Sequence, residues 1–292
     1  MRLSRKPALA SLHGRVAAVT GGGRGIGRAT AIALADAGAR VAVGDLDLDA
    51  AREVAAEIGS QAIGLPLDVT DAAALDTFVV AVQEQLGPID IMVNNAGIMP
   101  VDRLVDESHA TARKQVDINV HGVLHGCKAV LPGMLARRRG HIINVASSGG
   151  RIPVPGSVTY GGTKAFVAHA TDALRLELHG TGVTASAILP GIVKTDLTSG
   201  LHTPRGASEQ SPEAIAAAIL ATIGRPRPEV WVPASLGRQS RLLALIPRVI
   251  REPLVRVVGA DSYLLQRDES ARAAYQERAD REVKGTRDTE QV

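Results

Sequence analysis

A tyrosine and a lysine four residues apart are the side chains in this sequence best suited to moving a proton. Tyr160 and Lys164 stand in the run Y-G-G-T-K, and on a helix residues at this spacing share one face. A free phenol titrates near about pH 10 and is a poor base at neutral pH, but a nearby ammonium stabilises the phenolate and lowers the pKa of the tyrosine. The pair therefore predicts a general acid/base that exchanges a proton with an alcohol.

A glycine-rich loop lies far upstream of that pair. The run T-G-G-G-R-G-I-G at 20–27 follows a short apolar segment and opens a helical pattern. Glycines let the backbone turn tightly and approach a pyrophosphate, and the helix N-terminus offers N–H groups and a positive dipole end to an anion. The glycines follow G-x-x-x-G-x-G, at Gly21, Gly25 and Gly27, rather than G-x-G-x-x-G. The place of this loop between a strand and a helix predicts dinucleotide binding.

Asp45 ends the second predicted strand, 18 residues after Gly27. A carboxylate there accepts hydrogen bonds from both adenosine ribose hydroxyls and repels a 2′-phosphate. The sequence therefore favours NAD over NADP. Arg24 supports the opposite choice, since a guanidinium near that ribose could pair with the extra phosphate, so an NADP-linked ketone reductase stays open as an alternative.

Alternating strand and helix patterns surround these motifs. Such alternation indicates βαβ units with right-handed crossovers, so we expect one α/β, doubly wound (Rossmann-type), three-layer fold with a seven-stranded, mostly parallel sheet. The dinucleotide and the substrate should meet at the carboxyl ends of the strands. The predicted strands span 16–20, 40–44, 61–65, 89–93, 140–145, 183–188 and 229–232, and the predicted helices 25–37, 48–58, 71–86, 108–137, 158–179 and 212–223.

Taken together, the spaced motifs resemble those of the short-chain dehydrogenase/reductase family, in its standard-length branch, over residues 12–232. The glycine loop resembles the family's cofactor loop, and Ser147, 13 residues before Tyr160, matches its catalytic serine better than the adjacent Ser148. The other matching segments are Asp68-Val69, Asn94-Asn95-Ala96-Gly97, Asn119 and Pro190-Gly191-Ile192-Val193-Lys194-Thr195.

The resemblance implies roles for four catalytic residues. Tyr160 is the acid/base, and Lys164 binds the nicotinamide ribose and lowers the pKa of the tyrosine. Ser147 hydrogen-bonds the substrate oxygen, and Asn119 holds a water that links Lys164 to solvent. Val193 and Thr195 orient the carboxamide. The implied cofactor-binding residues are Gly21, Arg24, Gly25, Ile26, Gly27, Asp45, Asp68, Val69, Asn95, Ala96, Gly97, Tyr160, Lys164, Pro190, Gly191, Val193 and Thr195.

The C-terminal part is longer than the family core requires. We expect residues 12–232 to form the catalytic domain, 233–284 a helical extension packed on it, and 285–292 a disordered tail. The stretch 238–258 alternates arginines with apolar residues. Helices that pack over the substrate cleft or a subunit interface are the favoured interpretation, and docking on an anionic membrane is the alternative.

Composition excludes several classes of function. The net charge of +3 from 33 basic and 30 acidic residues does not indicate nucleic acid binding. The single cysteine, Cys127, cannot form an internal disulfide or a cysteine-based zinc site, and it fits a reducing cytoplasm. His121 and His125 are four apart, but no third metal ligand is evident, so no metal is expected. The start of the sequence does not read as a signal peptide, and we expect no spanning helix because no run of about 18 apolar residues is found.

The expected activity follows from these features. Met99, Val154, Pro155, Leu197, Leu201 and Pro204 suggest an apolar pocket under a mobile lid at 197–211. We therefore expect an oxidoreductase that transfers a hydride between NAD(H) and a lipophilic secondary alcohol or ketone that is steroid-, terpenoid- or acyl-like. A nucleotide-sensing binding protein without turnover is the alternative from another class. The resemblance also implies a homodimer or homotetramer, through the predicted helices 108–137 and 158–179.

Overall fold

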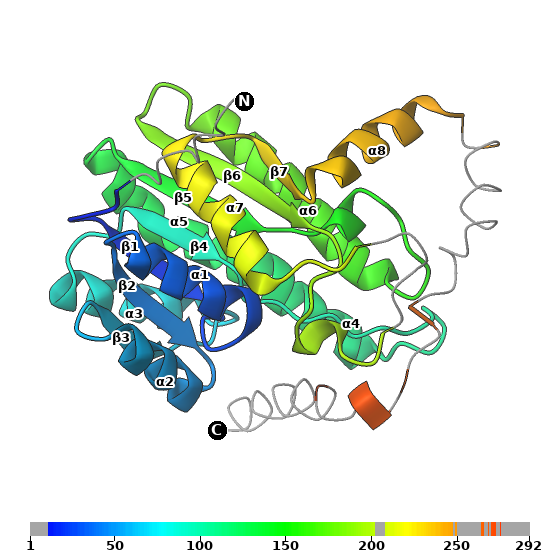
Figure 1. Cartoon of the computed structure of the whole chain (residues 1–292), viewed down its shortest axis with the longest axis horizontal. Helices are drawn as coiled ribbons and strands as arrows, with labels where there is room; N and C mark the ends of the chain where they lie inside the picture. Colours follow the sequence, from blue (N-terminus) through cyan, green and yellow to red (C-terminus); the bar gives the residue numbers. More distant parts are fainter. Residues whose placement is uncertain are drawn as a thin grey trace, which may run out of the picture.

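The computed structural model describes residues 11–201, 208–247, 249, 264–265, 268, 270–272 and 275. Its centre is a sheet of seven strands in the order β3-β2-β1-β4-β5-β6-β7, in which every neighbouring pair is parallel (Figure 1). This confirms the predicted doubly wound α/β fold, with a fully parallel rather than mostly parallel sheet. The strands are β1 (Val16–Thr20), β2 (Arg40–Asp45), β3 (Ala62–Pro66), β4 (Ile91–Asn94), β5 (Gly140–Val145), β6 (Val183–Pro190) and β7 (Glu229–Val232).

Helices cover both faces of the sheet and make the fold three-layered. Alternate residues of β1 face opposite sides, so Val16 and Ala18 belong to one apolar core and Ala17 and Val19 to the other. The first core includes side chains of α3 (Ala72–Gln85), α5 (Gly122–Ala136) and α6 (Val158–Glu177). The second includes side chains of α1 (Gly25–Asp36), α2 (Leu48–Ile58) and α7 (Pro212–Gly224).

The predicted long helix at 108–137 is interrupted. It consists of α4 (His109–Val116), a π-helical turn (Asp117–His121) and α5. The wider turn inserts an extra residue into the helical hydrogen-bonding pattern, and such turns are frequent at functional sites. Asn119, one of the expected site residues, lies inside it. Sequence periodicity predicts the helix but not this local widening.

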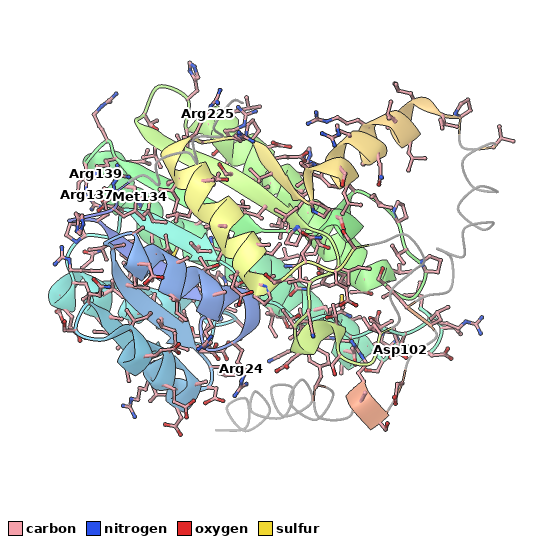
Figure 2. All side chains as sticks on the ribbon, in the orientation of Figure 1. Arg24, Asp102, Met134, Arg137, Arg139 and Arg225 are labelled. Atoms are coloured by element: carbon pink, nitrogen blue, oxygen red, sulfur yellow. The ribbon has the colours of Figure 1, made fainter. Side chains whose placement is uncertain are left out.

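Polar contacts hold the amino ends of the strands, at the opposite end of the molecule from the glycine loop. Asp90 is buried just before β4 and accepts two hydrogen bonds of 2.8 Å from the Arg139 guanidinium. It also accepts one of 3.2 Å from the backbone N–H of Val16. Figure 2 shows Arg139 at one end of the sheet, with Arg24 and Asp102 near the other. The end with Arg24 is the one that carries the glycine loop.

Beyond β7 the chain forms α8 (Ala234–Leu245), which extends away from the body of the domain (Figure 1). Gly237 packs against the ring of Trp231, while Leu242 and Leu245 are exposed. The rest of the predicted extension at 233–284 lies largely outside the described residues, as do the predicted tail at 285–292 and residues 202–207 of the predicted lid. Among the described residues, no helix is long and apolar enough to cross a membrane.

Candidate active site

A cavity of about 620 Å³ opens at the carboxyl ends of the strands. It brings together residues from the glycine loop, the ends of β2, β4, β5 and β6, and helix α6. Of the predicted site residues, Gly27 and Asn119 do not line it. Those that do are Gly21, Arg24, Gly25, Ile26, Asp45, Asp68, Val69, Asn95, Ala96, Gly97, Ser147, Tyr160, Lys164, Pro190, Gly191, Val193 and Thr195.

Gly27 lies behind the cavity wall and fixes the shape of the loop. A Cβ atom at this position would lie 2.0 Å from the carbonyl oxygen of Gly21 and 2.6 Å from the side-chain nitrogen of Asn95. That nitrogen donates hydrogen bonds to the carbonyls of Thr20 and Gly21, at 3.0 and 2.9 Å. Only a glycine lets α1 approach the loop this closely.

Asn119 is buried and connects two segments that border the cavity. Its Oδ1 accepts a hydrogen bond of 2.9 Å from the N–H of Ile98. Its Nδ2 donates to the carbonyl of Ile98 at 3.0 Å and to Oγ1 of Thr163 at 3.1 Å. Because Thr163 directly precedes Lys164, these bonds fix α6 against the segment after β4. The water-holding role that the resemblance implies for Asn119 stays a prediction.

Lys164 carries a buried ammonium group. Its Nζ donates a hydrogen bond of 2.9 Å to the carbonyl of Val145 and lies 6.0 Å from the centre of the Tyr160 ring. The side chain is 4% exposed, and burial lowers the pKa of Lys164 to about 8. A cation of this kind favours partners that can share its charge, such as hydroxyl oxygens in the cavity.

The pKa of Tyr160 requires a correction to the sequence argument. In the structure, burial raises the pKa of Tyr160, and a hydrogen bond with the Ser147 side chain acts in the opposite direction. Lys164 makes its hydrogen bond to Val145, and it is not among the groups that lower the tyrosine pKa. The lysine is close enough to share the cavity, but the four-residue spacing alone does not bring ammonium and phenol into direct contact.

Ser147 is the serine that contacts the tyrosine, as its spacing to Tyr160 predicts. It begins a 3-10 turn (Ser148–Gly150), and its Oγ accepts a hydrogen bond of 3.1 Å from the N–H of Gly149. The adjacent Ser148 also lines the cavity, but the hydrogen bond to Tyr160 belongs to Ser147.

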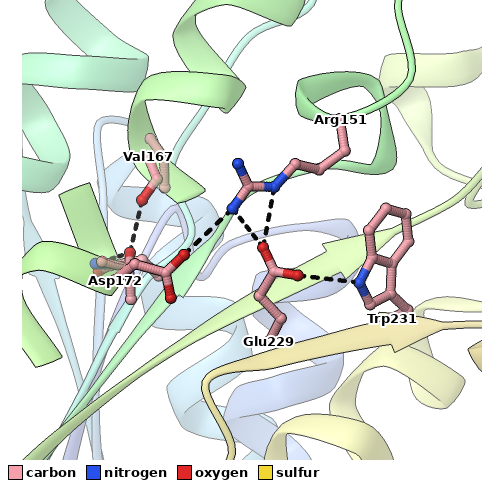
Figure 3. Close-up of polar contacts among 7 residues, drawn as sticks. Arg151, Val167, Asp172, Glu229 and Trp231 are labelled. Atoms are coloured by element: carbon pink, nitrogen blue, oxygen red, sulfur yellow. Dashed lines mark hydrogen bonds and ion pairs between the residues drawn. The ribbon is translucent and has the colours of Figure 1, made fainter. Parts of the chain in front are cut away.

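Arg151 connects the serine loop to α6 and β7 (Figure 3). Its guanidinium donates to Oε1 of Glu229, at 3.0 Å from Nε, and to Oδ2 of Asp172 at 3.3 Å. The second carboxylate oxygen of Glu229 accepts a hydrogen bond of 3.3 Å from the Trp231 indole. The arginine is partly exposed, so each ion pair contributes little to the free energy of folding. The network instead fixes the position of the Ser147 loop relative to the helix that carries Tyr160.

Asp45 lies beside the glycine loop at one end of the cavity. Its Oδ2 accepts a hydrogen bond of 2.8 Å from the N–H of Gly23, and its Oδ1 accepts one of 3.0 Å from the N–H of Asp47. Arg24 forms an ion pair with Asp47, and its side chain lies at the rim, away from the sheet (Figure 2). The guanidinium is therefore already engaged by a carboxylate.

The helix that follows the glycine loop has a free N-terminus. In the described part of the chain, the N-cap residue Arg24 makes no side-chain capping bond to α1, whereas Asp47 caps α2 and Asp71 caps α3. The first-turn N–H groups of α1 are thus available to an anion. Together with the fixed carboxylate of Asp45, they fit the pyrophosphate and ribose of a dinucleotide.

The remaining part of the cavity is apolar. Met99, Val154, Leu197 and Leu201 line it, as the sequence predicts. Pro155 is not among the described residues that line the cavity, and Pro204 lies outside the described residues. The four apolar side chains that do line the cavity pack in one cluster with Val101, Leu264 and Tyr160.

Sequence reasoning missed several lining residues, among them Lys114, Leu264 and Tyr275. Lys114 is one turn before the π-helical turn and is buried. Leu264 and Tyr275 belong to no recognisable motif and are far from the other site residues in the sequence. The sequence analysis favoured C-terminal helices that pack over the substrate cleft or a subunit interface, but this interpretation does not identify any single lining residue.

The paired histidines have other contacts. The His121 and His125 rings lie 6.2 Å apart edge to face, and Nδ1 of His125 lies 3.0 Å from the carbonyl of Val69. Across the described residues, no group of three His, Cys, Asp or Glu side chains is placed to hold a metal ion.

Comparisons with known proteins place this geometry in context. The short chain dehydrogenase family model matches residues 15–206. A sorbitol dehydrogenase from Cereibacter sphaeroides is 39% identical over 231 residues, which are 79% of this chain and 86% of that protein. A glycine betaine reductase from Emericella nidulans is 37% identical over 74% of this chain, but the match spans only 18% of that protein.

A solved structure shares the fold. The short chain dehydrogenase/reductase from Burkholderia phymatum, in complex with NAD, superimposes with a TM-score of 0.74 at 25% sequence identity. The superposition covers 80% of this chain and 94% of that chain.

Proposed function

Because the chain belongs to the short-chain dehydrogenase/reductase family, we propose that it transfers a hydride between NAD(H) and a lipophilic secondary alcohol or ketone. One observation carries the proposal. Ser147, Tyr160 and Lys164 line the same cavity as the glycine loop and Asp45, so acid/base groups and dinucleotide-binding groups face one space.

The proposed proton chemistry depends on Tyr160. Its phenolate takes the hydroxyl proton of the alcohol as the carbonyl forms, and its phenol returns that proton in the reverse direction. Ser147 donates a hydrogen bond to the substrate oxygen and stabilises the charge that develops there. The buried Lys164 ammonium holds ribose hydroxyls that enter the cavity. When bound, the dinucleotide supplies the hydride donor or acceptor.

NAD is the proposed cofactor rather than NADP. Asp45 is fixed by two backbone N–H groups, so its carboxylate cannot easily move away from a 2′-phosphate. Arg24, the residue that would favour NADP, is paired with Asp47. Both observations support the preference, as does the NAD in the similar structure from Burkholderia phymatum.

The apolar cluster supports a lipophilic substrate. Met99, Val154, Leu197 and Leu201 offer surface but few hydrogen-bonding groups, and a polyol bound there would lose contacts with water. The similar sorbitol dehydrogenase makes a polyol the natural competing substrate.

The test measures NADH formation with NAD⁺ and NADP⁺ separately, using lipophilic secondary alcohols and sorbitol, with Tyr160→Phe as the control. We expect turnover of the lipophilic alcohols with NAD⁺ and loss of turnover in the variant. Turnover of sorbitol alone would refute the substrate class, and a preference for NADP⁺ would favour the ketone reductase. If Tyr160→Phe binds NADH and keeps its full biological activity, the result would support the alternative of a nucleotide-sensing binding protein without turnover.

A homo-oligomer is also proposed. Val116 on α4 and Val158, Phe166 and Leu176 on α6 are exposed apolar side chains on the two helical regions where the family resemblance expects subunit contact. Light scattering of the purified protein measures the mass directly, and a monomer at micromolar concentration would refute this part.

A further inference from the structure

Tyr275 connects the far C-terminal part of the chain to the loop after β4. Its hydroxyl accepts a hydrogen bond of 2.7 Å from the N–H of Met99, across 176 positions of sequence. The side chain is buried, and it lines the same cavity as Tyr160. Since the hydroxyl is turned to the backbone, the ring contributes apolar surface to the cavity.

Arg272 joins the same two sides of the cavity. Its Nη2 donates a hydrogen bond of 2.6 Å to the carbonyl of Met99, and its Nη1 donates to the carbonyls of Leu197 and Ser199 at 3.0 and 3.2 Å. The guanidinium lies 4.8 Å from the centre of the Tyr275 ring, in the range of a cation–π contact. Arg272 is 3% exposed, so its charge is held in place by these carbonyls.

Backbone contacts attach this segment to the loop after β6. The N–H of Asp268 donates a hydrogen bond of 2.8 Å to the carbonyl of Gly200, and Oγ of Ser199 donates one of 2.9 Å to the carbonyl of Ala271. Gly200 has a φ of +71°, and a Cβ there would lie 2.5 Å from the carbonyl oxygen of Asp268. The close approach requires glycine.

We propose that Tyr275 is a specificity-determining residue that forms the outer wall of the substrate half of the cavity, with Arg272 as the positioning residue that holds it. The inference rests on the proposed function and deepens it by naming the residue that limits substrate size. Leu264, also buried and lining the cavity, belongs to the same wall.

The wall predicts a size-dependent effect. An aromatic side chain covers about 150–250 Å² of surface, so Tyr275→Ala opens the cavity for bulkier alcohols and removes contacts from small ones. A difference of one methylene in an apolar pocket changes selectivity by about 10–200-fold. We therefore expect the ratio of kcat/KM for a bulky against a small alcohol to rise at least tenfold. Tyr275→Phe keeps the ring, so this ratio should stay within about threefold.

The experiment uses the full chain with 2-butanol, 2-octanol and decahydro-2-naphthol as probes. Wild type, Tyr275→Ala and Tyr275→Phe are compared with Ser270→Ala, a matched control because Ser270 is exposed in the same segment and contacts Asp268. NADH affinity is titrated by fluorescence for each protein. Calorimetry of the same probes with the protein–NADH complex gives dissociation constants that do not depend on turnover.

A raised bulky-to-small ratio in Tyr275→Ala, with NADH affinity and the Ser270→Ala control unchanged, supports the proposal. An unchanged ratio in kcat/KM and in dissociation constants overturns it, as does a failure of every probe to bind. Probe binding without turnover in the wild type would refute the proposed function alone, and the dissociation constants would still decide the role of Tyr275.

The positioning role of Arg272 is tested by measuring KM and kcat separately. Arg272→Met keeps the apolar stem but loses the three carbonyl contacts, so we expect KM for 2-octanol to rise at least fivefold with kcat nearly unchanged. Arg272→Lys should recover part of that loss. A lower melting temperature without a change in KM would mean that Arg272 only stabilises the fold, and would overturn its positioning role.

Discussion

Replacing Lys164 with methionine should abolish activity and yet make the protein free of cofactor more stable at neutral pH. Lys164 is 4% exposed, and burial lowers its pKa from 10.5 to about 8. At pH 7 the folded protein therefore holds a buried charge that the unfolded chain solvates freely. Methionine has a similar length and no charge, so it should occupy the same space without that cost.

The magnitude follows from linkage. A pKa of about 8 in the folded state against 10.5 in the unfolded state corresponds to about 3 kcal/mol. The substitution also leaves the carbonyl of Val145 without the hydrogen bond from Nζ, which costs about 1–3 kcal/mol. We expect Lys164→Met to raise the free energy of unfolding by about 1–2 kcal/mol at pH 7. Between pH 8 and 10.5 the unfolded chain binds the proton more tightly, so the wild type gains stability with rising pH and the variant does not.

The assay is urea unfolding of both proteins without cofactor at several values between pH 7 and 10.5, together with NADH formation. The difference in stability should shrink by about 3 kcal/mol across this range and reverse its sign, while activity falls at least about 100-fold. A variant that is less stable than the wild type at pH 7, with a difference independent of pH, would refute the argument that the buried ammonium opposes folding.

Three further predictions concern other parts of the domain. Asp45→Ala should lower the KM for NADP⁺ at least tenfold and raise that for NAD⁺, because the carboxylate that repels a 2′-phosphate is gone; unchanged cofactor preference in steady-state kinetics would contradict this. Burial, with a smaller contribution from Arg15, lowers the pKa of His141 to about 4, so its share of stability, about 3 kcal/mol, is lost as pH falls from 6.5 to 4. His141→Gln should flatten this part of the stability profile in urea unfolding, and a profile identical to that of the wild type would count against it. Gly27→Ala should greatly weaken NADH binding in a fluorescence titration, since its Cβ would meet the Gly21 carbonyl at 2.0 Å. Gly162 lies on the exposed side of α6, and a Cβ there would have no heavy atom of the described residues within 4 Å. Gly162→Ala should therefore leave NADH binding unchanged and stabilise the fold by about 0.5–1 kcal/mol. Equal losses of NADH affinity in Gly27→Ala and Gly162→Ala would contradict the steric reasoning.

The fold and most of the cavity could be predicted because they depend on local patterns. The spacing of Tyr160 and Lys164 requires only a helix, and the glycine loop requires only a strand followed by a helix. Asp45 follows from its place at the end of a strand. Parallel strands bring their carboxyl ends together, so these local signals converge on one edge without any long-range information.

The features that were missed depend on burial or on distant contacts. The raised pKa of Tyr160 comes from burial, which a four-residue spacing cannot report. The π-helical turn at Asn119 reflects packing against Ile98 and Thr163. Tyr275 reaches Met99 from 176 residues away, and no periodicity in the sequence indicates that contact.

The position of the cavity wall has a consequence for how this protein can change over evolutionary time. The sheet ends at Val232, and the predicted dinucleotide-binding residues precede it, whereas Leu264, Arg272 and Tyr275 follow it. Leu264 belongs to a cluster beside the cavity that is separate from both apolar cores, and neither core contains Arg272 or Tyr275. Mutations at these three positions therefore leave both cores intact. New substrate preferences can therefore arise there with little effect on the stability of the sheet, while the predicted dinucleotide-binding residues stay unchanged.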